Sequence, residues 1–103
     1  MVASETVLDY SGTPKELWPV FDKALRLLEE RDGSYGMRWV TEPMGHHYEN
    51  VRRKAGGVAD MIERLQGGET VNIDKLKEDL LDMMNYGAIV YKRIELVYER
   101  IGL

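Results

Sequence analysis

Apolar residues recur every three or four positions in three segments of the chain, which is the spacing of one face of an α-helix. The segments are residues 14–31, 45–65 and about 73–100. We therefore predict an all-α fold, a bundle of three main helices in one domain that begins at residue 13. Residues 1–12 mix small, polar and β-favouring side chains and are expected to form an N-terminal arm.

Local signals mark the ends of the first helix. Thr13 suits an N-cap, Pro14 the first helical position, and Glu16 completes a capping box. Asp-Gly-Ser at residues 32–34 is expected to end the helix. The next stretch, residues 35–45, contains two glycines and a proline and is predicted to be a structured loop.

The second and third helices differ in how regular they are. Gly56 and Gly57 interrupt the second, which predicts a close helix approach, a bend or a local break. Asn72 or Asp74 caps the third. Its apolar side comprises Leu80, Met83, Met84, Gly87, Tyr91, Ile94, Tyr98 and Ile101. At roughly 40 Å this helix is too long for two shorter partners to cover, so several of these residues stay exposed in a single chain and we expect a homodimer.

Composition narrows the classes of protein. The 103 residues contain no cysteine, which excludes disulfides and thiolate metal sites. The net charge of −4, from 14 basic and 18 acidic residues, argues against binding to a nucleic-acid backbone. Neither a secretory signal nor an apolar run of about 18 residues is seen, so a membrane location is not expected and a cytoplasmic one is.

The start of the third helix carries a concentration of oxygen-bearing side chains. Glu78, Asp79, Asp82 and Asn85 lie on adjacent turns around one face. Mg²⁺ prefers such ligands, with waters and substrate phosphates completing its shell. An acidic, solvated face near a helix N-terminus explains the same pattern through the helix dipole. Asp82 and Asn85 lie within a Met-rich stretch, where a polar contact between helices that fixes their register is the alternative to a site.

Further candidate residues precede this helix. Arg53 and Lys54 belong to a basic run and could bind phosphate, although surface salt bridging, as from Arg53 to Glu49, is the more usual explanation of such a run. Trp39 could stack on a base or close the end of the bundle. The adjacent His46 and His47 point about 100° apart and lack a third nearby ligand, so the sequence assigns them no role.

Three stretches, YGMRW, HHYENVRRKAGG and EDLLDMMNYGAIVY, together resemble the nucleotide modification associated domain family over residues 16–98. That family is similar to the all-α nucleotide pyrophosphatases of the MazG type, whose metal site joins an EExxE motif on one helix to an ExxD pair on the next. Asp79 and Asp82 match the second pair in chemistry and spacing. The EExxE motif is missing, because Glu49 is followed by a basic run.

The resemblance implies a dimeric helical bundle with a role in nucleotide metabolism or base modification, often in a phage. We accordingly predict binding of a nucleotide or phosphate with Mg²⁺ at a degenerate MazG-like site. Any turnover would be a Mg-dependent nucleotide pyrophosphohydrolase-like reaction. The alternative is a non-enzymatic module that presents an acidic surface, including Glu29 and Glu30, to a host protein.

Overall fold

The computed structural model describes residues 11–35 and 42–99, and every regular element in these ranges is helical. The elements are a short 3-10 helix η1 (Pro14–Leu17), the α-helices α1 (Trp18–Tyr35), α3 (Met44–Gln66) and α4 (Ile73–Arg93), and a π-helix η2 (Ile94–Glu99). The predicted all-α fold with three main helices is confirmed. Most of the expected N-terminal arm lies outside the described residues.

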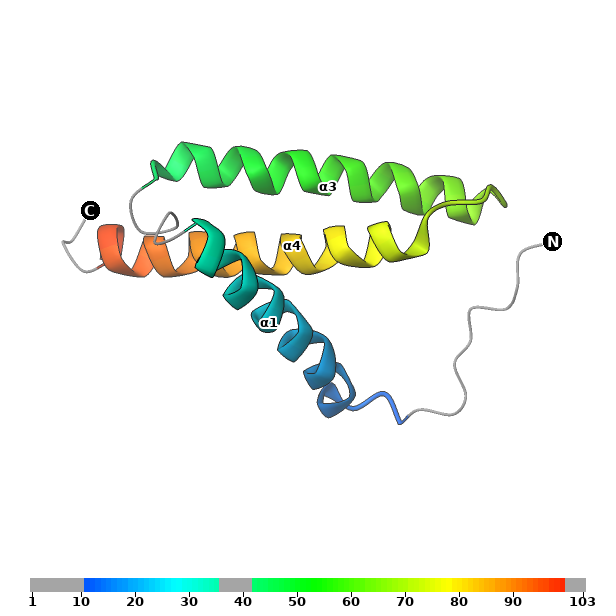
Figure 1. Ribbon diagram of the computed structural model, residues 1–103, viewed down its shortest axis with the longest axis horizontal. Coiled ribbons are helices and arrows are strands. Elements are labelled where there is room, and N and C mark those ends of the chain that lie inside the picture. Colours follow the sequence, from blue (N-terminus) through cyan, green and yellow to red (C-terminus); the bar gives the residue numbers. More distant parts are fainter. Residues whose placement is uncertain (1–10, 36–41, 100–103) are drawn as a thin grey trace.

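Helix α4 is the central element of the fold. Figure 1 shows α3 and α4 lying side by side and antiparallel, whereas α1 crosses α4 near the C-terminal end of α1. Residue contacts link α4 extensively to both α3 and α1. The N-terminal half of α1 diverges from the other two helices (Figure 1), so the chain forms a V rather than a closed bundle.

The helix ends agree only in part with the sequence signals. Thr13 is extended before η1 but makes no side-chain cap, and the Glu16 carboxylate accepts a hydrogen bond from the Ser11 backbone at 2.8 Å. Helix α1 continues through residues 32–34 to Tyr35. A glycine in the last turn of a helix costs only about 1 kcal/mol, which is too little to end the helix by itself. By contrast, Asn72 caps α4 as predicted, accepting from the Lys75 backbone at 3.1 Å.

Gly56 and Gly57 leave α3 uninterrupted. The helix runs from Met44 to Gln66, and both glycines are exposed. A Cβ atom added at either position would meet nothing within 4 Å. The expected close approach or break is therefore wrong, because no element within residues 11–35 and 42–99 packs against this side of α3.

The buried face of α4 is largely polar. Its buried residues are Leu76, Asp79, Asp82, Asn85 and Ile89. Much of the apolar side predicted from the sequence is left uncovered by the other described helices. Tyr91 is 68% exposed, and Leu80, Ile94 and Tyr98 are also exposed. The expectation that several of these residues stay uncovered in a single chain is confirmed.

Candidate functional site

The polar face of α4 forms one half of a cluster of charged side chains at the junction of the three helices. We call this set the ion-pair cluster, and it consists of Arg31 from α1, Lys54 from α3, and Lys75, Glu78, Asp79 and Asp82 from α4. Spacings of three and four residues along α4 direct its acids to one side, toward both neighbouring helices.

Lys54 lies between the two buried acids. Its Nζ atom is 2.9 Å from Asp79 Oδ1 and 3.1 Å from Asp82 Oδ2. Asp79 is 6% exposed and Asp82 3%, and the Lys54 side chain is 17% exposed. One ammonium group therefore joins α3 to two successive turns of α4 in a position that water hardly reaches.

Arg31 and Lys75 contact the same acids from the edge of the cluster. The Arg31 guanidinium donates to Asp82 through Nη1 and to Glu78 Oε1 through Nη2, the latter at 2.7 Å. The more exposed Lys75 lies one turn before Asp79, and its Nζ is 3.2 Å from Asp79 Oδ1. Each buried carboxylate is thus bound by two cations.

The ion-pair cluster is electrically balanced, with three cationic and three anionic side chains. The hydrogen bond from Lys54 holds the pKa of Asp79 below its usual value, although burial opposes this shift. The hydrogen bond to Asp79 in turn raises the pKa of Lys54 against the effect of burial. Both groups are therefore charged at neutral pH, as pairing requires when ions are taken out of water.

Asn85 extends the polar face by one turn. Its amide nitrogen donates to the Ala24 carbonyl oxygen at 2.8 Å, and this buried bond ties α4 to α1. The amide oxygen is the atom that could ligate a cation. The interhelical contact that the sequence offered as an alternative for Asn85 is therefore present.

The other predicted residues lie apart from the cluster. The exposed Arg53 donates to Asn50 Oδ1 at 3.3 Å, and Glu49 pairs with Arg52 rather than with Arg53. Trp39, for which a base contact is predicted, lies outside the described residues. Of the predicted phosphate ligands, Lys54 alone joins the acids of α4.

The two histidines have different surroundings. His46 is exposed, and its Nε2 is 3.2 Å from Glu42 Oε2, whereas His47 is 3% exposed. Their rings are 6.0 Å apart and inclined at 74°. One histidine is thus exposed and the other buried, which agrees with the expectation that adjacent helical residues point in different directions.

Sequence reasoning missed two members of the cluster. Lys75 could have been found, because it precedes Asp79 by four residues on the same helix. Arg31 carried no such signal, because its partners Glu78 and Asp82 are 47 and 51 residues away in sequence.

The donor set allows a test of the predicted metal site. Within residues 11–35 and 42–99, no three side chains of the His, Cys, Asp or Glu type are grouped so as to hold a metal ion. Asp79 and Asp82 nevertheless share one bound cation, the Lys54 ammonium. Two carboxylates that converge on one cation fit the usual protein contribution to a Mg²⁺ site that is completed by substrate phosphate and water.

Comparisons with models of known protein families, with curated proteins and with solved structures found no match to this chain. None of the described helices is both long enough and apolar enough to cross a membrane. Fold and site together define a helical protein with a partly buried, charge-balanced cluster where three helices meet.

Proposed function

We propose that this chain binds a nucleotide or a nucleotide-linked phosphate together with Mg²⁺ at the ion-pair cluster. Mg²⁺ would be held by Asp79 and Asp82, with Asn85 and Glu78 beside them. The phosphate would be bound by Lys54 and Arg31. The role of Arg53 would be confined to steering an anion toward the cluster, because its guanidinium is exposed and lies outside it.

The observation that carries the proposal is the position of Lys54 between two buried carboxylates. A Mg²⁺–phosphate pair brings one cationic and one anionic partner, so it can replace the internal ion pairs without leaving a buried charge unbalanced. Mg²⁺ takes the carboxylates, and the released Lys54 and Arg31 take the phosphate oxygens. The cluster is then the ligand-free form of the site, in which the protein's own cations bind its acids.

The identity of the residues favours binding over hydrolysis. The MazG-type proteins that the sequence resembles bring a second group of acids from the neighbouring helix. Here the α3 residue that reaches the acids of α4 is Lys54, while Glu49 and Glu63 of α3 are exposed. One pair of buried carboxylates can hold a single Mg²⁺, which suits retention of a nucleotide.

Calorimetric titration with a panel of nucleoside triphosphates in the presence of Mg²⁺ tests the proposal. We expect Asp82→Asn to weaken binding at least about tenfold, equivalent to about 1.4 kcal/mol, because it removes an anionic ligand. Asp60→Asn on α3 is the matched control, since Asp60 is exposed, and its affinity should equal that of the parent. Absence of heat with every nucleotide, or equal affinity of Asp82→Asn and the parent, would show that the assignment is wrong.

A second candidate function is a protein-interaction module in which the cluster serves only to fix the three helices. It is favoured by the internal pairing of every acid in the cluster and by the exposure of Glu29 and Glu30 on α1. A stoichiometric partner protein that is retained by Asp82→Asn and lost on charge reversal at Glu29 and Glu30 would support this alternative. Loss of the partner protein with Asp82→Asn alone would count against this alternative function.

A further inference from the structure

The side of α4 opposite the buried polar face carries an apolar stripe that the chain leaves uncovered. The stripe consists of Leu80, Met84 and Tyr91 of α4 and continues into η2 with Ile94 and Tyr98. All of them except the half-buried Met84 are exposed. Leu80, Met84, Tyr91 and Ile94, with Gly87 between them, follow alternating steps of four and three residues. This is the heptad spacing of a helix that packs along another helix.

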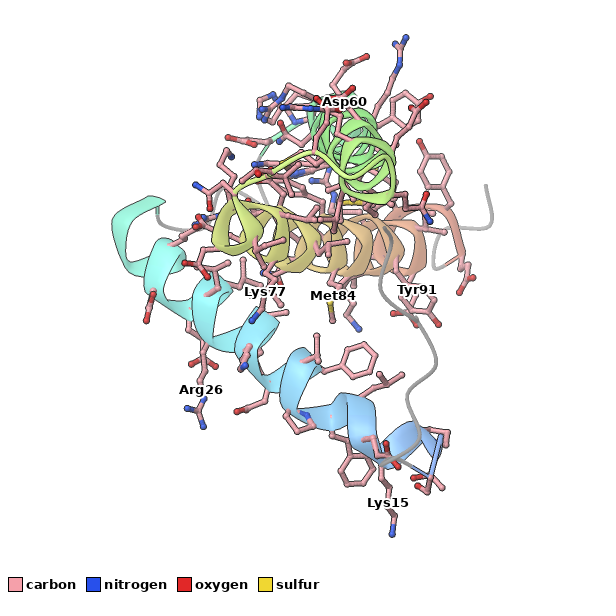
Figure 2. The ribbon with its side chains drawn as sticks, turned by 90° about the vertical axis from the view of Figure 1, so that its right-hand side faces the viewer. Lys15, Arg26, Asp60, Lys77, Met84 and Tyr91 are labelled. Carbon is pink, nitrogen blue, oxygen red and sulfur yellow. The ribbon has the colours of Figure 1, made fainter. Side chains whose placement is uncertain are left out.

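Helix α1 carries a second uncovered apolar face. Leu17 at the end of η1, and Trp18, Val20, Phe21 and Leu25 of α1, are between 41% and 64% exposed. These residues lie in η1 and in the first half of α1. Figure 1 shows that this part of the chain diverges from α4. In Figure 2, Met84 and Tyr91 project from α4 on the side where α1 lies, whereas Asp60 projects from α3 on the opposite side.

These uncovered apolar faces are large compared with the small apolar interior of the chain. The buried apolar residues among those described are only Ala24, Val58, Leu76 and Ile89. The exposed fractions on the two faces correspond to several hundred Å² per chain, the order of the roughly 800 Å² that each partner contributes to a stable interface. A domain with so few buried apolar residues gains most by sharing a core across such an interface.

We propose that a second copy of this chain occupies the opening of the V, with the apolar stripe of α4 and the divergent half of α1 from each copy enclosing one shared core. A second copy supplies both of the apolar helices that the opening requires, and a two-fold axis pairs each of these two uncovered faces with its counterpart in the other copy. Two helices from each copy then form a four-helix bundle. The inference is independent of the proposed ligand, because the ion-pair cluster lies on the opposite face of α4.

Sedimentation of the purified chain over a range of concentrations tests this interface. We expect a dimer for the parent chain, and at least a hundredfold weaker dimer for Tyr91→Glu and for Phe21→Glu, since each buries a carboxylate in the shared core. Leu65→Glu makes the same chemical change at a 41% exposed residue of α3 outside the opening, and it should leave the dimer intact. Circular dichroism of each variant checks that its helices are retained.

A second measurement applies if Tyr91→Glu or Phe21→Glu loses its helices. The chain has no cysteine, so a single Met84→Cys substitution reports on one position only. Met84 lies near the middle of the continuous helix formed by α4 and η2, and a two-fold axis through the stripe brings its two copies together. Mild oxidation should link Met84→Cys into dimers many times faster than Asp60→Cys.

Two results would overturn the proposal. One is a parent chain that stays monomeric at all concentrations up to about 1 mM, which would assign the opening to residues 1–10 or to a different protein. The other is a dimer that is broken by Leu65→Glu and kept by Tyr91→Glu, which would place the interface on α3.

Discussion

Lys54 is the residue that determines how the acids of α4 can coexist in a buried position. Two carboxylates within reach of one ammonium would repel each other strongly without it. Replacement of one partner in a buried ion pair leaves an uncompensated buried charge. The loss of folding stability is then far larger than the stability that the intact pair contributes. The same ammonium marks the position that the proposal assigns to Mg²⁺.

Lys54→Met should lower the free energy of unfolding by about 3 kcal/mol near neutral pH, because it leaves Asp79 and Asp82 with fewer partners. The lowered pKa of Asp79 sets the pH dependence. Stabilisation by a carboxylate with a lowered pKa is complete above its unfolded value and is lost as the pH falls through its folded value. The free energies of unfolding of parent and variant, measured with urea, should therefore differ by a constant amount above about pH 5, and this difference should shrink below pH 3.8.

Lys54→Arg provides the control for this experiment, because it keeps a cation near both acids and should recover most of the stability. A difference between the parent and Lys54→Met that stayed unchanged down to pH 2 would show that Lys54 stabilises the fold through its aliphatic chain alone.

At the scale of single residues, the sequence indicated the acids but not all of their partners. Asp82 and Asn85 could be singled out, because polar side chains within a Met-rich helix need hydrogen-bond partners if they are buried. Both are buried and bonded. Arg31 could not be identified, since its role depends on the angle at which α1 crosses α4, and no local pattern encodes that angle.

At the scale of elements, the apolar periodicity located the three helices but did not decide which face of α4 would be buried. Asp79 and Asp82 are stable in the interior because cations from α3 and α1 meet them there. Within one chain, the apolar side containing Tyr91 is then turned outward. Periodicity identifies a face that avoids water, and only the arrangement of helices shows what covers it.

The uninterrupted course of α3 leads to a prediction about its glycines. Gly56→Ala and Gly57→Ala should each raise the free energy of unfolding by about 0.5–1 kcal/mol, because an added Cβ meets no neighbour and alanine favours the helix. Thermal melts monitored by circular dichroism measure the effect. Gly68 is the contrasting position, since its φ of +87° disfavours any side chain, and Gly68→Ala should lower the melting temperature. A loss of stability in both α3 variants would indicate that another molecule packs closely on this side.

At the scale of the whole molecule, the ion-pair cluster and the apolar stripe lie on opposite sides of α4. The side toward α3 and the end of α1 holds the ion-pair cluster, and the other side holds the apolar stripe. In the proposed dimer the two clusters would lie outside the shared core and remain accessible. The sequence predicted the exposed apolar residues from the length of the third helix, but the V shape that gathers them depends on how α1 diverges.

The balanced charge of the cluster also predicts how its ligands should depend on each other. Mg²⁺ alone would add positive charge to a neutral cluster, and a nucleotide alone would add negative charge. Only the two together can replace the internal pairs one for one. Their binding should therefore be coupled, and the coupling must be the same whichever ligand is added first.

The most direct measurement is a calorimetric titration of the parent chain with a nucleoside triphosphate, in Mg²⁺ and in EDTA. We expect binding in Mg²⁺ and an affinity at least about tenfold lower in EDTA, a coupling of about 1.4 kcal/mol or more. Equal affinity in the two buffers, or no binding in either, would contradict the assignment of Asp79 and Asp82 as ligands of a nucleotide-bound Mg²⁺.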